Sequence, residues 1–198
     1  MNHATRLPDP AVVWLTGLSG AGKSTIAVEV CGRLRMMGAR VEYLDGDEIR
    51  SLFPNTGFSR AERDAHIRRV GYVASRLEHH GVFVVCALIS PYAASRQQAR
   101  QLCRRFVEVH VATPLTECER RDVKGLYRRA RAGEISGFTG LDDPYETPVN
   151  PELRLDTTGI TVAEAADAVV ATFGPFPGLG RALEAAATRS APRAGTAS

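Results

Sequence analysis

Residues 17–24 read Gly17-Leu18-Ser19-Gly20-Ala21-Gly22-Lys23-Ser24, the pattern G-x-x-x-x-G-K-[ST] of a phosphate-binding loop. The apolar run 12–15 precedes this loop, and an amphipathic segment follows it. A loop between a strand and a helix points successive backbone N–H groups at one place, which suits a polyphosphate. Lys23 is expected to reach the β- and γ-phosphates, and the Ser24 hydroxyl to bind Mg²⁺. We therefore expect this loop, together with Thr25, to bind a nucleoside triphosphate.

The composition is that of an ordinary globular protein. The chain has 198 residues, of which 44% are hydrophobic and 24% charged, so one domain with a substantial core is expected. The formal net charge is +3, and arginine supplies nearly all of the positive charge. This surplus suits a small anionic substrate and is too weak to indicate nucleic-acid binding. Without a signal peptide or a membrane-length apolar run, we expect no membrane association and a cytoplasmic location.

The four cysteines form no C-x-x-C pair, which argues against a zinc site. Cys31 and Cys86 fall in apolar segments. Buried free thiols are therefore expected rather than disulfides.

Apolar runs of strand length alternate with longer helical patterns, which predicts an α/β fold with a parallel sheet flanked by helices. Two helices are predicted from apolar residues at helical spacing. The first contains Ile26, Val30, Leu34 and Met37 and ends at Gly38, and the second contains Ile67, Val70, Ala74 and Leu77 and ends at Gly81. The predicted strands are 11–16, 40–44, 82–89, 106–111 and 153–156, and the other predicted helices are 93–103, 114–121 and 162–173.

Two segments depart from this alternation. Residues 122–152 are rich in Gly, Pro, Arg and acidic residues, and so long a loop inside a compact domain is usually a functional lid. From residue 174 onward Gly, Pro, Ala, Ser and Arg prevail, which predicts a disordered tail. We therefore divide the chain into an N-terminal extension (1–10), a phosphate-loop kinase domain (11–173, lid at about 122–150) and a C-terminal tail (174–198).

Asp45 and Asp47 follow the second predicted strand, with one glycine between them. Ligands of open α/β sheets collect at the carboxyl ends of the strands. One carboxylate can order Mg²⁺, and the other can orient or deprotonate an attacking hydroxyl. The structural alternative is that one of the two only caps the helix that begins near Glu48.

Basic and aromatic residues follow at short intervals. Arg63 and His66 are three residues apart, so they share one helix face and can border an anionic ligand. Arg68 and Arg69 fit a solvated surface better. Phe58 beside Gly57 is either a platform for a flat ring or a core residue.

Six stretches resemble the adenylylsulfate kinase family and extend over residues 11–173. They are GLSGAGKST (17–25), LDGDEIR (44–50), GFSRAERDAHIRR (57–69), ISPY (89–92), RDVKGLYRRARAGEISGFTGLDDPYETP (121–148) and NPELRLDT (150–157). The loop motif is common to many kinases, whereas ISPY and the long block are more specific. The resemblance implies a P-loop NTPase fold, ATP and Mg²⁺, adenosine 5′-phosphosulfate as the substrate, and a homodimer.

In this family the γ-phosphoryl group of ATP passes to the 3′-hydroxyl of adenosine 5′-phosphosulfate. By motif position, Asp47 and Arg50 would contact this acceptor, with Asp47 near its hydroxyl. Phe58 and Phe138 would sandwich the adenine, and Arg63 would hold the phosphosulfate. The resemblance also implies contacts from His66, Ile67, Ile89, Ser90, Lys124 and Gly137.

The expected catalytic set is Lys23, Asp45, Asp47, Ser90 and Lys124, with Ser24 and Asp45 on the metal side. Lys124 opens the lid block and would add positive charge over the transferred phosphoryl group. The family is described with a phosphoserine intermediate at the position of Ser90. Transfer between two bound substrates needs positioning and charge neutralisation rather than a covalent step.

The chain departs from the family pattern at three positions. Glu48 and His66 stand where the family usually has asparagines, and Val123 replaces a proline. One alternative is therefore a related kinase for another anionic hydroxyl substrate. The other is a nucleotide-binding regulatory or scaffolding protein, against which Lys23, Asp47 and Lys124 argue.

Overall fold

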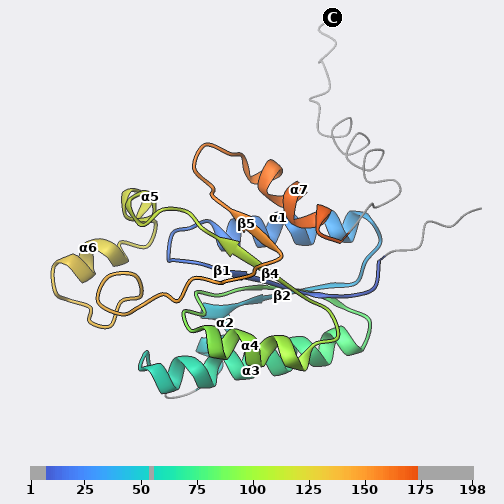
Figure 1. The fold of residues 1–198 in the computed structure, drawn as a ribbon, viewed down its shortest axis with the longest axis horizontal. Helices are drawn as coiled ribbons and strands as arrows, with labels where there is room; N and C mark the ends of the chain where they lie inside the picture. The colour runs from blue at the N-terminus through green and yellow to red at the C-terminus, as the bar shows by residue number, and fades with distance from the viewer. Residues whose placement is uncertain (1–7, 54–55, 174–198) are drawn as a thin grey trace, which may run out of the picture.

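A single parallel sheet forms the centre of the computed structural model, which describes residues 8–53 and 56–173 (Figure 1). The described strands are ordered β2-β3-β1-β4-β5. Strand β1 pairs in parallel with both β3 and β4, and β2 and β5 form the two edges. The strand bounds are Val12–Thr16 (β1), Val41–Asp45 (β2), Phe83–Ala87 (β3), Phe106–Val111 (β4) and Leu153–Leu155 (β5).

Helices cover both faces of this sheet, as a parallel sheet requires. Helices α1 and α7 lie on one face, and α3 and α4 lie on the other (Figure 1). The short helices α5 and α6 project beyond one end of the sheet (Figure 1). The helix bounds are Lys23–Met36 (α1), Gly46–Ser51 (α2), Arg60–His79 (α3), Ala93–Leu102 (α4), Leu115–Arg121 (α5), Leu126–Arg131 (α6) and Val162–Ala171 (α7).

The core lies in two layers, one on each side of the sheet. Successive side chains of a strand point to opposite faces. Val13 and Leu15 of β1 therefore join the layer beneath α1 and α7, while Val12 and Trp14 join the layer against α3 and α4. All five residues of β1 are buried, which is typical of a central parallel strand.

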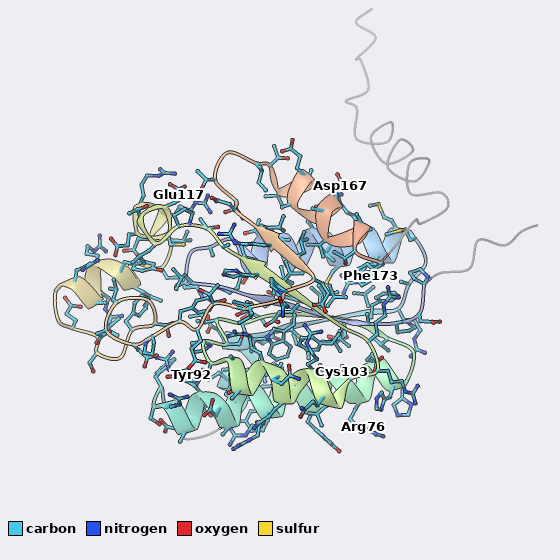
Figure 2. The ribbon with its side chains drawn as sticks, in the orientation of Figure 1. Arg76, Tyr92, Cys103, Glu117, Asp167 and Phe173 are labelled. Carbon is cyan, nitrogen blue, oxygen red and sulfur yellow. The ribbon has the colours of Figure 1, made fainter. Side chains whose placement is uncertain are left out.

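The carboxyl ends of the strands meet at the end of the sheet that carries α5 and α6. The phosphate-binding loop follows β1, Asp45 ends β2, and the segment 88–91 follows β3. In Figure 2, Tyr92 lies at this end of α4 and Cys103 at the opposite end. The topology therefore gathers the sequence-predicted site residues at one edge.

The predicted strands and main helices are confirmed, with small differences in their bounds. β3 ends at Ala87 instead of residue 89, and the helix expected near Glu48 begins at Gly46. Cys31 and Cys86 are free and buried, as predicted. Among the described residues, no helix combines the length and apolar character needed to cross a bilayer. The predicted tail and most of the N-terminal extension lie outside the described residues.

Candidate active site

A cavity of about 670 Å³ opens at the carboxyl edge of the sheet. It brings together the phosphate-binding loop, the turn after β2, one face of α3, and residues of the segment 122–150 that the sequence predicts as a lid (the lid segment, or lid, below). The predicted site residues that line it are Ser19, Gly20, Gly22, Lys23, Ser24, Thr25, Asp45, Asp47, Arg50, Phe58, Arg63, His66, Ile67, Ile89, Ser90, Lys124 and Phe138. Four predicted residues (Gly17, Leu18, Ala21 and Gly137) lie outside this lining.

Glycine is required at two points of the phosphate-binding loop. Gly22 precedes α1 with a φ of 100°, in the left-handed region that favours glycine. At Gly17, a Cβ atom would lie 2.4 Å from the carbonyl oxygen of Val111. The loop can therefore turn into α1 without strain only with glycine at these positions.

The buried Lys23 side chain folds back along this loop. Its Nζ donates hydrogen bonds to the carbonyl oxygens of Gly17 (3.0 Å) and Leu18 (2.7 Å). Burial lowers the pKa of Lys23 to about 8, so the amine is still mostly charged at neutral pH. The loop thus holds one positive charge at the place where phosphates are expected.

Three hydroxyl side chains that the sequence did not indicate hold the phosphate-binding loop through hydrogen bonds to its carbonyl oxygens. The hydroxyls of Thr113 and Thr157 both donate to the carbonyl oxygen of Ala21, at 3.0 and 3.1 Å. The Tyr127 hydroxyl of α6 donates to the carbonyl oxygen of Ser19 at 3.0 Å. These contacts join segments far apart in sequence, and no local motif announces them.

One oxygen of Asp45 takes the capping role that the sequence offered as the structural alternative, and the other lies beside Ser24. Its Oδ1 accepts from the N–H groups of Asp47 (2.8 Å) and Glu48 (3.4 Å), so it caps α2. Its Oδ2 accepts from the Tyr43 hydroxyl (2.7 Å) and the Ser24 hydroxyl (3.3 Å). Burial alone would raise the pKa of Asp45, but these hydrogen bonds hold the pKa below its ordinary value.

The pairing of Ser24 with Asp45 fits a magnesium ion. Magnesium is commonly bound through one or two protein oxygens together with substrate phosphates and water. A hydroxyl and an ionised carboxylate side by side next to the phosphate-binding loop are such a donor set. In the described part of the chain, no group of three or more His, Cys, Asp or Glu side chains could hold a metal by itself.

Asp47 pairs with Lys124, which lies near the start of the lid segment. The Lys124 Nζ donates to Asp47 Oδ2 at 2.5 Å, and both side chains are exposed. The hydrogen bond that Lys124 donates to Asp47 is the main reason that the pKa of Lys124 is raised. The structure therefore connects the start of the lid to the edge of β2 through two predicted catalytic residues.

Phe58 is an exposed wall of the cavity and not a core residue. Its side chain is 63% exposed, and the Arg50 guanidinium lies 4.7 Å from the centre of its ring. Phe138 from the lid also lines the cavity and packs edge-on against Tyr127, with ring centroids 5.0 Å apart. The two aromatic residues predicted to enclose a flat ring thus belong to the same cavity.

His66 is buried in the wall of this cavity at 2% exposure. Neither ring nitrogen makes a hydrogen bond of ordinary geometry to a described residue. Burial and the Arg50 charge lower the pKa of His66 to about 4, and a weaker contact with the Gly46 backbone only partly offsets them. A neutral imidazole is therefore available to a ligand. Glu48, another departure from the family, is exposed and outside the cavity lining.

Ser90 lies at the cavity border with its hydroxyl in an internal network. The Ser90 Oγ accepts from Trp14 Nε1 (3.0 Å) and donates to Thr16 Oγ1 (2.9 Å), and the residue is 2% exposed. Its φ of 40° is unusual for a residue with a side chain. Arg96 Nη1 donates to the Ser90 carbonyl oxygen at 2.8 Å, which helps to hold this backbone.

The far end of the lid segment is anchored by three acidic residues. Asp142 accepts from the N–H groups of Gly137 and Phe138 at 2.7 and 2.6 Å. Asp143 accepts from the Tyr92 hydroxyl, and Glu146 from the Ala93 N–H group. The arginines of α5 and α6 pair with glutamates of α5 or of the turn after α6: Arg120 and Arg121 with Glu117, Arg131 with Glu119, and Arg129 with Glu134.

Comparison with known proteins gives a consistent match. The family model described as adenylylsulphate kinase matches residues 9–156. An adenylyl-sulfate kinase of Synechococcus sp. (strain JA-3-3Ab) is 53% identical over 159 residues, which cover 80% of this chain and 90% of that protein. A Picosynechococcus sp. adenylyl-sulfate kinase is 56% identical over 146 residues, covering 73% of this chain and 82% of that protein.

Solved structures agree with the sequence comparison. The Mycobacterium tuberculosis APS kinase CysC, in complex with AMPPNP and APS, superposes with a TM-score of 0.81 and 43% identity. That match covers 85% of this chain and 100% of the solved chain. A hexameric APS kinase from Thiobacillus denitrificans gives a TM-score of 0.64 at 36% identity, covering 83% of this chain and 29% of that one.

Proposed function

The chain belongs to the adenylylsulphate kinase family, and from this premise we propose that it phosphorylates the 3′-hydroxyl of adenosine 5′-phosphosulfate with ATP. The product is 3′-phosphoadenylylsulfate. The observation that carries the proposal is one cavity that contains the phosphate-binding loop, the Asp45–Asp47 turn, Phe58 and Phe138. A donor site for a triphosphate and an acceptor site for a flat ring thus share one space.

On the donor side, the backbone N–H groups of the phosphate-binding loop cradle the β- and γ-phosphates of ATP. Lys23 supplies a fixed positive charge for the γ-phosphoryl group, since the loop carbonyls already hold its ammonium in place. Stabilisation of the transferred charge is the main catalytic requirement of phosphoryl transfer. Lys124 adds a second positive charge from the lid.

On the acceptor side, Asp47 orients the attacking 3′-hydroxyl and accepts its proton. Its partnership with Lys124 brings that carboxylate to the start of the lid. Phe58 and Phe138 enclose the adenine, while Arg50 and the neutral His66 contact the rest of the acceptor. Lid closure over both substrates would exclude water and prevent hydrolysis of ATP.

Ser24 and Asp45 would hold Mg²⁺ in this proposal. The bound ion would supply positive charge that neutralises the charge developing on the phosphates. Asp45 remains ionised for this task, because its hydrogen bonds keep its pKa low.

The observation that favours a second candidate is the pair of departures at Glu48 and His66. A related kinase with another small anionic acceptor would keep the same donor side and change the acceptor contacts. Of the two residues only His66 lines the cavity, so His66 would carry most of that change.

One assay separates the two candidates: formation of 3′-phosphoadenylylsulfate from adenylylsulfate and MgATP, with ATP consumption without acceptor as the blank. The native chain is compared with the Glu48→Asn, His66→Asn double variant. Turnover by the native chain supports the proposal. Turnover in the double variant alone would refute it and indicate a retuned acceptor pocket.

We further propose a homodimer located in the cytoplasm, where ATP is available. The free cysteines suit a reducing compartment. Light scattering of the purified chain measures the oligomeric state, and a monomeric mass would contradict the dimer.

A further inference from the structure

The Arg63 side chain makes three hydrogen bonds in the cavity wall. The side chain is 7% exposed and sits between the first turn of α3 and the lid. Its Nε donates to the carbonyl oxygen of Phe58 at 2.6 Å. Its two terminal nitrogens donate to Thr139 Oγ1 and to the carbonyl oxygen of Gly137, each at 2.5 Å. One guanidinium thus joins segments 74 to 76 residues apart.

All three acceptors belong to, or lie next in sequence to, the two aromatic residues that wall the cavity, Phe58 and Phe138. Phe58 is held directly through its own carbonyl oxygen. Phe138 is held on both sides, because its two sequence neighbours are the lid acceptors. Arg63 therefore sets the relative position of Phe58 and Phe138, which do not contact each other through a ring interaction in the described part of the structure.

We infer that Arg63 is the positioning residue of the acceptor site, and that its planar guanidinium fixes the gap between Phe58 and Phe138. This inference rests on the proposed function for the identity of the flat ring that enters the gap. It differs from the anion-binding role that the family resemblance implies for Arg63. A guanidinium carries five N–H donors, and three of them are committed to the walls.

Lysine cannot replace arginine in such a role, although it keeps the charge. The ammonium is a compact point charge, whereas the guanidinium is a rigid fork whose donors diverge. The acceptors lie on two separate segments, so one ammonium cannot satisfy all of them. A purely anion-binding Arg63 would tolerate lysine better, because the charge is retained.

Other supports of the walls do not make this connection. Arg50 Nη1 donates to the carbonyl oxygen of Gly57 at 2.6 Å, and Glu62 accepts from the Gly57 N–H group. Asp142 holds the N–H groups of Gly137 and Phe138 from the lid side. Each of these acts within one wall, and Arg63 alone among these side chains bridges both.

The sharpest test leaves Arg63 in place and removes one of its acceptors. Thr139→Val deletes the hydroxyl with little change of shape, and Thr139→Ser keeps it. We expect Thr139→Val to raise the KM for adenylylsulfate roughly tenfold at unchanged KM for ATP, from the loss of one charge-assisted hydrogen bond. Thr139→Ser should behave as the native chain. An equal response of the two variants would overturn the inference.

A double-mutant cycle separates positioning from direct anion binding. Arg63→Lys alone should raise the acceptor KM roughly ten- to a hundredfold. In a Phe138→Ala background one wall is already missing, so Arg63→Lys should cost much less. A full additive loss in that background would show that Arg63 acts on the substrate directly. Arg76→Lys, on the same helix but outside the cavity lining, is the control (Figure 2).

Amide hydrogen exchange gives a readout that needs no substrate. Thr139→Val should speed exchange in residues 57–59, on the wall opposite the substitution, and Thr139→Ser should not. Unchanged exchange there would refute the coupling even if the native chain lacked adenylylsulfate turnover. Absent turnover in the native chain would refute only the proposed function.

Discussion

The substitution Ser90→Ala tests whether phosphoryl transfer passes through this serine. The hydroxyl of Ser90 accepts from Trp14 Nε1 and donates to Thr16 Oγ1, deep beneath the cavity border. A side chain engaged in this way supports the turn and is poorly placed to attack a phosphate. We therefore expect Ser90→Ala to lower stability while phosphoryl transfer remains within about tenfold of the native rate.

The expected loss of stability follows from the partners left behind. Trp14 Nε1 loses its acceptor in a buried site, which costs about 1–3 kcal/mol. Thr16 keeps contacts with the Ile89 carbonyl oxygen (2.7 Å) and the Tyr145 hydroxyl (3.0 Å), so its loss is small. For a domain of this size the melting temperature should fall by about 2–12 °C. The backbone strain at φ 40° is common to serine and alanine and cancels.

Three measurements on the same variant decide the question: turnover with adenylylsulfate and MgATP, the melting temperature, and tryptophan fluorescence. Trp14 is the one tryptophan of the chain, so its emission reports directly on the lost hydrogen bond. Ser75→Ala is the matched control, because this buried hydroxyl donates only within its own helix, to the Tyr72 carbonyl oxygen. A folded Ser90→Ala protein with turnover reduced by about 10⁴-fold or more would refute the reasoning and favour a phosphoserine intermediate.

Three further substitutions test other parts of the molecule. Lys23→Ala should lower turnover by roughly 10²–10³-fold or more, because the γ-phosphoryl group loses its fixed charge. Initial rates, measured on a variant with a native melting temperature, check this. Near-native rates would exclude a catalytic role for Lys23 in the phosphate-binding loop. Asp47→Asn should lower the turnover number by roughly 10²–10⁴-fold with ATP affinity nearly unchanged, as measured by calorimetry beside kinetics; an equal loss of ATP affinity would move Asp47 to the metal side. Burial and the nearby charges of Arg154 and Arg96 lower the pKa of His110 from 6.5 to about 4. As the pH falls from about 7, the ring is therefore protonated in the unfolded chain before it is protonated in the folded chain. This difference lowers the free energy of unfolding as the pH falls. His110→Gln should therefore lose less stability than the native protein between about pH 7 and pH 5 in urea unfolding, and an identical loss would contradict this account.

The parts of the fold that could be predicted from sequence are those with local causes. Residues 12–15 of strand β1 are an uninterrupted apolar run, and the glycine-rich loop after the strand has a fixed pattern, so their order and chemistry can be recognised without a structure. The same holds for Asp45 and Asp47, because residues at the ends of parallel strands share one edge. The bounds of β3 were less predictable, since the apolar run continues past Ala87 after the pairing ends.

The contacts that hold the site together were not predictable, because each joins distant segments. Thr113 and Thr157 meet at the Ala21 carbonyl oxygen only after β4 and β5 are paired. Arg63 was recognised as a candidate from its helix face, but its acceptors on the lid lie more than seventy residues away. Asp142 likewise gains its partners only in the folded turn, where the N–H groups of Gly137 and Phe138 lie close to its carboxylate.

The two lysines of the chain differ in burial, since Lys23 is buried and Lys124 is exposed. The chain contains many arginines but only Lys23 and Lys124 as lysines, and both line the cavity. Arginine forks suit fixed contacts such as those of Arg63, whereas a lysine is a flexible point charge that can follow a phosphoryl group. Burial fixes Lys23 at the loop, whereas Lys124 is exposed and in the proposed mechanism would exchange its Asp47 partner for the transferred group. One buried and one exposed positive charge thus line the same cavity, which suits a reaction that depends on positioning and charge stabilisation.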